Sequence, residues 1–218
     1  WSELHGGYDV HSSELVHGWL TLTYVLARPL ARARVAPTAV TAVGVAFAVL
    51  ALAVAGSGPW GAGTAALLLV LSALVDSLDG AVALLRGRST AFGYVADSVA
   101  DRLSDMLVFA VLLVLGAPAP LVLAVALLTL LHETARARAV SAGMESIGVV
   151  TVWERPSRVI AVVVTLLGAS VVDTGSLFGT IGAAVSLVLA VVGFSQISVS
   201  IHHALSALPA PRPGRTRE

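Results

Sequence analysis

Residues 76–101 begin with Asp76-Ser-Leu-Asp79-Gly80-Ala-Val-Ala83 and end with Gly93-Tyr-Val-Ala-Asp97-Ser-Val-Ala-Asp101, and Asp105 follows one helical turn later. Both ends belong to apolar runs long enough to cross a membrane. An ionised carboxylate at bilayer depth costs roughly 2.5–3.5 kcal/mol, so five of them would together cost on the order of 12 kcal/mol, comparable with the stability of a whole domain. This cost indicates that the aspartates have a functional partner of opposite charge.

The five aspartates form two acidic stripes if both runs are helical. Asp76 and Asp79 have i, i+3 spacing, while Asp97, Asp101 and Asp105 have i, i+4, i+8 spacing, so each set lies on one helical face. We expect the two faces to meet in the folded protein.

Positive charge close to the aspartates in the sequence is too scarce to neutralise them. The nearest cations, Arg86, Arg88 and Arg102, are fewer than the acids, and their long side chains can reach toward water instead. Carboxylate oxygens suit a hard cation such as Mg²⁺ or Mn²⁺, as one ion or as two ions about 3.5–4 Å apart. The chain has no cysteine, which excludes thiolate zinc and iron–sulfur sites.

The composition is that of an integral membrane protein. Hydrophobic residues make up 57% of the chain and charged residues only 12%, against roughly 25% charged residues in a soluble domain. We predict an all-α fold with six transmembrane helices at about 38–56, 62–85, 93–116, 119–140, 157–173 and 177–203. The predicted organisation is an N-terminal segment at 1–37, one transmembrane domain at 38–205 and a disordered cytoplasmic tail at 206–218.

The N-terminal segment contains its own helical pattern. Residues 11–34 mix apolar side chains with polar and basic ones, which is typical of an amphipathic helix lying along the membrane surface. The alternative is a short additional apolar segment without a special role.

All 13 basic residues are arginines, and their positions predict the orientation of the chain. Apart from Arg102, they lie before the first predicted span, between the second and third, around the connection between the fourth and fifth, or after the last. The positive-inside rule therefore places both termini and the two longer connections in the cytoplasm. The aspartates lie near that side, so the site is predicted to open toward cytoplasmic substrates at the bacterial cell membrane.

The two acidic segments resemble the signature of the CDP-alcohol phosphotransferase family, D-x-x-D-G-x-x-A-R, eight residues, G-x-x-x-D-x-x-x-D. The chain departs from this pattern at Leu84, where the family has arginine. The resemblance implies a homodimer of six-helix subunits with one or two divalent ions under a CDP-linked donor. It also implies that Asp76, Asp79 and Asp97 are metal ligands. Asp101 would be both a ligand and the base that takes the proton from the acceptor hydroxyl while CMP is expelled.

The donor side of the implied site consists of small and polar residues. Gly80, Ala83 and Gly93 lack bulk and would let a nucleotide approach the helix backbone, although membrane helices also use such residues simply to pack. Thr41 resembles the family's entry to the first helix, and Arg86 lies close enough to stand in for the arginine missing at Leu84.

The acceptor side resembles actinobacterial phosphatidylinositol phosphate synthases. The segments Arg136-Ala-Arg138-Ala-Val-Ser-Ala-Gly143 and Glu154-Arg155-Pro156-Ser-Arg158 carry the similarity. It implies that Arg136, Arg155 and Arg158 surround the phosphate of inositol phosphate, a role that suits arginine. The alternative is that these arginines only anchor helix ends. An arginine of the last helix in that subfamily has no counterpart here, where the chain has Ile197.

The predicted function is the transfer of a phosphatidyl group from CDP-diacylglycerol to inositol phosphate with release of CMP. Glycerol 3-phosphate or another alcohol is the alternative acceptor. A divalent-cation transporter would need acids continuing across the membrane, whereas the residues after Asp105 are apolar. An inactive family member is disfavoured because all four motif aspartates remain. Membrane lipids and a second subunit are the expected partners, and nucleic acid is not.

Neighbouring polar residues are predicted to be structural. Asp105 lies one turn beyond the motif and is expected to orient Arg102 or an acceptor-side arginine. Glu154 is expected to pair with an arginine. His132 and Glu133 are expected to form structural hydrogen bonds, and the alternative is that they bind a substrate hydroxyl.

Overall fold

The computed structural model describes residues 14–87, 90–144, 150–172 and 175–207. Seven helices and no strand occur in these ranges: α1 (Glu14–Arg32), α2 (Pro37–Val54), α3 (Gly58–Leu85), α4 (Ala91–Val114), α5 (Ala119–Ser141), α6 (Arg155–Val171) and α7 (Gly175–Ser206). The all-α prediction is therefore confirmed. Arg88 and residues 208–218 of the predicted tail lie outside the described residues.

The helices begin and end where the sequence provides the appropriate residues. Proline stands in the first turn of α2, α3, α5 and α6, where its missing N–H is not needed. Thr90 caps α4 by accepting a hydrogen bond from the Gly93 N–H over 3.0 Å. Gly116 follows α4 with φ +87°, a conformation that glycine adopts readily.

Four helices of the described chain are long and apolar enough to cross a membrane: α2, α3, α5 and residues Ser176–Ser206 of α7. The predicted spans 93–116 and 157–173 exist as helices α4 and α6, but six transmembrane helices are not confirmed. The α6 helix has only 17 residues. The α4 helix carries Asp97, Asp101, Arg102 and Asp105, which lower its hydropathy.

Small residues allow α2 and α3 to pack closely along their length. Ala48 and Ala51 of α2 and Ala65 of α3 are fully buried. The Ser72 hydroxyl of α3 donates a 2.8 Å hydrogen bond to the Gly44 carbonyl of α2. Close approach of small residues is the usual basis of helix association in lipid, and here it fixes the helix that carries the first acidic segment.

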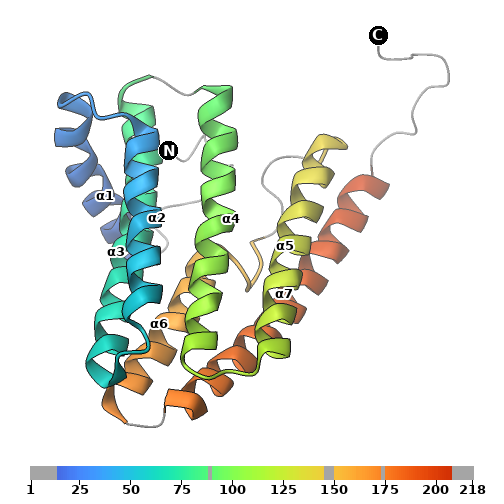
Figure 1. Cartoon of the computed structure of the whole chain (residues 1–218). Coiled ribbons are helices and arrows are strands. Elements are labelled where there is room, and N and C mark those ends of the chain that lie inside the picture. Colours follow the sequence, from blue (N-terminus) through green and yellow to red (C-terminus); the bar gives the residue numbers. More distant parts are fainter. Residues whose placement is uncertain (1–13, 88–89, 145–149, 173–174, 208–218) are drawn as a thin grey trace.

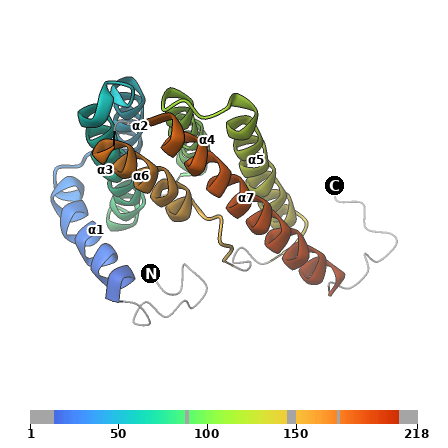
Figure 2. The same cartoon turned by 90° about the horizontal axis from the view of Figure 1, so that it is seen from below.

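The α1 helix covers the outer side of α3 (Figure 2). Its buried Ala27 packs with Leu78 and Val82 of α3, and the Trp19 indole N–H donates to the Ser77 hydroxyl over 3.2 Å. The helix predicted within 11–34 is thus present, although its position at a membrane surface is not shown.

The connections that bear arginines lie toward one end of the bundle. In Figure 1 the α1–α2 and α3–α4 connections are at the top with the end of α5, and α6 begins below that level. The segment before α6 reaches into the core through Trp153, which is fully buried and stacks on Phe109 of α4 with 6.1 Å between ring centroids. Its indole N–H donates to the Thr129 hydroxyl of α5 over 2.8 Å. The start of α6 is therefore anchored against α4 and α5, beside the second acidic segment.

Candidate active site

Three aspartates meet where α3 faces α4. Carboxylate oxygens of Asp76, Asp97 and Asp101 lie within 4.8 Å of one another, and all three side chains are half-buried. We call these residues the carboxylate group. An all-oxygen donor set from two helices suits a hard divalent cation, and the helical spacing alone had predicted that these acids share a face.

Asp79 lies one turn further along α3 and stands apart from the carboxylate group. Its side chain is buried, and its Oδ2 accepts a hydrogen bond from the Thr41 hydroxyl over 2.5 Å. The structure thus brings together three of the four aspartates predicted as ligands. It also connects two predicted site residues, Thr41 and Asp79, for which no contact had been expected.

Arg155 extends from the start of α6 onto the carboxylate group. Its Nη1 lies 2.7 Å from Asp76 Oδ2 and also pairs with Asp101 Oδ1. A residue predicted to bind the acceptor therefore links two predicted metal ligands that belong to different helices.

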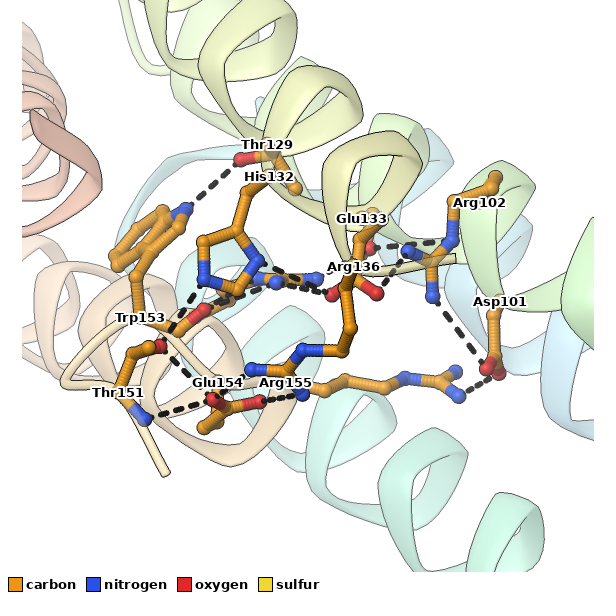
Figure 3. A network of polar contacts seen from close by, with 12 residues as sticks. Asp101, Arg102, Thr129, His132, Glu133, Arg136, Thr151, Trp153, Glu154 and Arg155 are labelled. Carbon is orange, nitrogen blue, oxygen red and sulfur yellow. Dashed lines mark hydrogen bonds and ion pairs between the residues drawn. The ribbon is translucent and has the colours of Figure 1, made fainter. Parts of the chain in front are cut away.

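A second set of charges lies beside this group and involves α4, α5 and the start of α6 (Figure 3). We call it the buried network; its members are Arg102, Asp105, Glu133, Arg136, Glu154 and Arg158. Arg158 is fully buried and pairs with Asp105 over 2.8 Å and with Glu133 over 2.6 Å. It also donates to the Trp153 carbonyl.

Arg102 connects the network to the carboxylate group. Its Nη1 lies 3.0 Å from Glu133 Oε2, and its Nη2 lies 3.6 Å from Asp101 Oδ2. Asp105 contacts Arg158 and lies within 4.0 Å of Arg102, as its predicted orienting role requires.

The loop before α6 is fixed by Glu154. Both oxygens of this carboxylate accept from Arg136, over 3.0 and 2.5 Å, and Oε1 also accepts from the Thr151 N–H and hydroxyl over 2.8 Å each. Burial raises the pKa of Glu154, but the hydrogen bonds from Arg136 and Thr151 outweigh it and hold the pKa below its ordinary value. His132 is fully buried and contacts the Thr151 hydroxyl over 3.1 Å, so its predicted structural hydrogen bond is present.

The predicted acceptor arginines therefore have different surroundings. Arg136 and Arg155 are half-buried, whereas Arg158 has no exposed side-chain surface. All donors of Arg158 face Asp105, Glu133 and the Trp153 carbonyl, so direct contact with an acceptor does not fit this geometry.

The predicted donor residues lie near the ends of α3 and α4. A side chain at Gly80 would meet nothing within 4 Å, so the helix surface there is open. Ala83 is half-buried on α3, one turn beyond Asp79, and Leu84 is 52% exposed. Arg86 donates to the Val35 carbonyl over 2.5 Å, which ties it to the α1–α2 connection. Gly93 serves the cap of α4, where a side chain would come within 3.0 Å of the Thr90 hydroxyl.

Three functional contacts were missed at the sequence level. Arg102 was predicted as a nearby cation and as a possible partner of Asp105, but its contacts with Asp101 and Glu133 were not predicted, although its place beside Asp101 in the sequence was a usable signal. Thr151 was not considered. Gln196, which precedes Ile197, accepts from the Val152 N–H over 2.9 Å and ties α7 to the loop before α6. Ile197 itself is fully buried.

The sequence model of the CDP-alcohol phosphatidyltransferase family matches residues 34–194. The chain belongs to this family. It is therefore a transferase, and with four apolar helices it is a membrane protein. Family membership together with the oxygen-rich carboxylate group supports dependence on a divalent metal ion.

Similar proteins come from bacteria and archaea. Phosphatidylinositol phosphate synthase of Mycolicibacterium smegmatis is 36% identical over 162 residues, which cover 68% of this chain and 69% of that protein. Archaetidylinositol phosphate synthase of Aeropyrum pernix is 36% identical over 122 residues, covering 56% of this chain and 62% of that protein.

Two crystal structures of Mycobacterium tuberculosis phosphatidylinositol phosphate synthase share the fold. The structure with bound CDP-diacylglycerol has a TM-score of 0.62 at 30% identity and covers 83% of this chain and 95% of that one. The structure with manganese and citrate has a TM-score of 0.66 at 27% identity and covers 89% and 93%.

Proposed function

We propose that this chain transfers the phosphatidyl group of CDP-diacylglycerol to inositol phosphate and releases CMP. The observation that best supports this proposal is the carboxylate group of α3 and α4, which the guanidinium of Arg155 contacts. Such an arrangement supplies ligands for a cation and a partner for an anionic acceptor at one place. The similarity to phosphatidylinositol phosphate and archaetidylinositol phosphate synthases favours this acceptor over glycerol 3-phosphate.

The metal ligands in this proposal are Asp76, Asp97 and Asp101, with Asp79 completing the site beside them. One or two Mg²⁺ or Mn²⁺ ions bound there would neutralise charge on the diphosphate of the donor and on the departing CMP. Thr41 holds the carboxylate of Asp79 in place by its 2.5 Å hydrogen bond.

Asp101 is the proposed base. Its carboxylate accepts the proton of the acceptor hydroxyl while that oxygen bonds to the β-phosphorus of the donor, and the bond from this phosphorus to the CMP oxygen breaks. Arg102 and Arg155 flank Asp101 and fix its carboxylate relative to α5 and α6. Gly80, Ala83 and Gly93 are the proposed contacts of the nucleotide, and the helix surface at Gly80 is open.

Arg136 and Arg155 are the proposed ligands of the acceptor phosphate, because both side chains remain partly exposed. We assign Arg158 a positioning role instead: it holds the Trp153 carbonyl and thereby the loop that presents Arg155. This division retains two of the three predicted acceptor arginines.

The proposed membrane arrangement has six spans, with α4 and α6 joining the four apolar helices. The charges of α4 face partners on α5 and α6, which lowers the cost of placing this helix in lipid. The arginine-bearing connections would face the cytoplasm of a bacterial cell, and α1 would lie at the membrane surface through exposed Trp19, Leu22 and Tyr24. A homodimer is the proposed assembly.

The decisive experiment is CMP release from the full chain in lipid vesicles containing CDP-diacylglycerol and Mg²⁺. We expect release with inositol phosphate, little release with glycerol 3-phosphate or unphosphorylated inositol, and none after chelation of the metal. The matched control is the Asp97→Asn variant, which removes one predicted ligand. Release that proceeds equally well with unphosphorylated inositol would contradict the assigned acceptor, and absence of release with every acceptor would contradict the donor.

A further inference from the structure

The three arginines predicted to bind the acceptor differ in the acids that hold them. Arg136 is paired with Glu154, and Arg158 with Asp105 and Glu133, none of which belongs to the carboxylate group. Arg155 is paired with Asp76 and Asp101, which do belong to it. Among these arginines, Arg155 therefore shares its partners with the metal proposed above.

The backbone that carries Arg155 is fixed on several sides. The N–H and hydroxyl of Thr151 bind Glu154, the Val152 N–H binds Gln196 of α7, and the Trp153 carbonyl accepts from Arg158. Trp153 is also fully buried, and Gly193 of α7 packs directly against it. If Arg155 changes partner, its long, rotatable side chain therefore moves while the loop stays in place.

A guanidinium and a divalent cation compete for the same carboxylate oxygens. The positive charge of Arg155 beside these oxygens opposes binding of a metal ion there until the guanidinium moves. If the carboxylates are free of the guanidinium for only a fraction of the time, their apparent affinity for the metal ion is reduced by that fraction. Because such coupling is reciprocal, metal binding must in turn weaken the hold of the acids on Arg155.

We propose that Arg155 is an exchangeable counter-ion. It pairs with Asp76 and Asp101 until a divalent cation takes these carboxylates, and its released guanidinium then binds the phosphate of the acceptor. This inference rests on the proposed function and adds an order of events, with the metal bound before the acceptor. The half-buried surroundings allow it, since Arg155 and both acids keep about a fifth of their side-chain surface in contact with solvent.

Binding of Mn²⁺ to the full chain in detergent, followed by electron paramagnetic resonance without any substrate, tests the competition. We expect Arg155→Gln to bind Mn²⁺ about tenfold more tightly than the unaltered chain. Arg102→Gln is the matched control: it removes another positive charge that contacts Asp101, at 3.6 Å, but one that does not bridge to Asp76. Screening limits such a charge effect to about threefold or less.

Equal affinities for Arg155→Gln and Arg102→Gln would overturn the exchange while leaving the metal site intact. Mn²⁺ binding that is absent from the unaltered chain, or unchanged in Asp97→Asn, would overturn the metal assignment and the exchange together. These outcomes separate failure of the inference from failure of the proposed function, since neither needs turnover.

A second measurement uses the unaltered chain and does not depend on the folding of a variant. Phenylglyoxal modifies accessible guanidinium groups, and mass spectrometry gives the rate at each arginine. We expect Mn²⁺ to raise modification of Arg155 several-fold and to leave the fully buried Arg158 unchanged. An unchanged rate at Arg155 under saturating Mn²⁺ would show that the guanidinium keeps its carboxylates and would overturn the proposal.

Discussion

The carboxylate group and the buried network use the same residue types one helical turn apart on α4, yet their charge is balanced differently. The network combines three arginines with three acids, and its central pair of Arg158 and Asp105 is 0% and 2% exposed. The carboxylate group combines three acids with one close arginine, Arg155, and remains half-buried. A surplus of acids leaves carboxylate oxygens for a ligand, whereas a set with equal numbers of arginines and acids pairs its carboxylates internally.

The contrast is sharpest between Asp101 and Asp105, which are successive members of one helical stripe. Asp101 lies beside Asp76 of α3 and Asp97 and pairs with the half-buried Arg155, whereas Asp105 pairs with the fully buried Arg158. A single turn thus separates an acid proposed to react from an acid that supports the structure. Their substitutions should therefore differ in kind.

The largest effect is expected for Asp101→Asn. Removing the proposed base should lower the CMP release rate by about 10²–10⁴-fold, the usual contribution of general-base catalysis. Thermal stability should change little, because Asp101 is half-buried and solvent weakens its ion pairs with Arg102 and Arg155. Asp105→Asn is the matched control and should do the opposite, lowering the melting temperature while the folded protein retains most of its rate. Equal rate losses in the two variants would erase the distinction between the two groups.

Arg158→Leu should show the next largest effect, on stability. It removes the buried partner that Asp105 and Glu133 share and leaves them only Arg102, and breaking a buried ion pair costs about 3–5 kcal/mol. Denaturation in detergent measures this loss. Arg138→Leu, at an exposed position on α5, is the control and gives the loss of stability caused by removing an unburied arginine. A loss as small as that of Arg138→Leu would mean that the network does not hold the start of α6.

Much of the site follows from local spacing. The helical intervals of the aspartates predicted which acids share a face, and proline, glycine and apolar runs predicted seven helical segments within a few residues. Asp79 shows the limit of this reasoning. Its place in the motif predicts a ligand, but the helical spacing gave no sign that Thr41, which lies 38 residues away, donates a hydrogen bond to its carboxylate.

The partners of the arginines could not be read from the sequence. Arg155 and Arg158 find their aspartates 54 and 53 residues away, and periodicity states which face a residue occupies without stating which helix covers that face. The three arginines looked equivalent for this reason. Burial and the excess of acids on one side separate them only after α6 has packed against α4 and α5.

The smallest expected effect concerns Glu154 and tests the electrostatic side of the network. Its pKa is lowered in the folded protein, chiefly by Arg136 acting against burial. Its contribution to stability is therefore complete above the ordinary pKa of 4.5 and is lost as pH falls through the lower folded-state value. Glu154→Gln should melt a few degrees below the unaltered chain near neutral pH, and the two curves should converge in acid. Arg136→Gln should return the Glu154 pKa toward its ordinary range. In a chain that carries Arg136→Gln, the effect of Glu154→Gln on the melting temperature should therefore depend less on pH. If the difference in melting temperature between Glu154→Gln and the unaltered chain stays constant from neutral to acid pH, Glu154 holds the loop by shape rather than by charge. The network would then resemble ordinary packing.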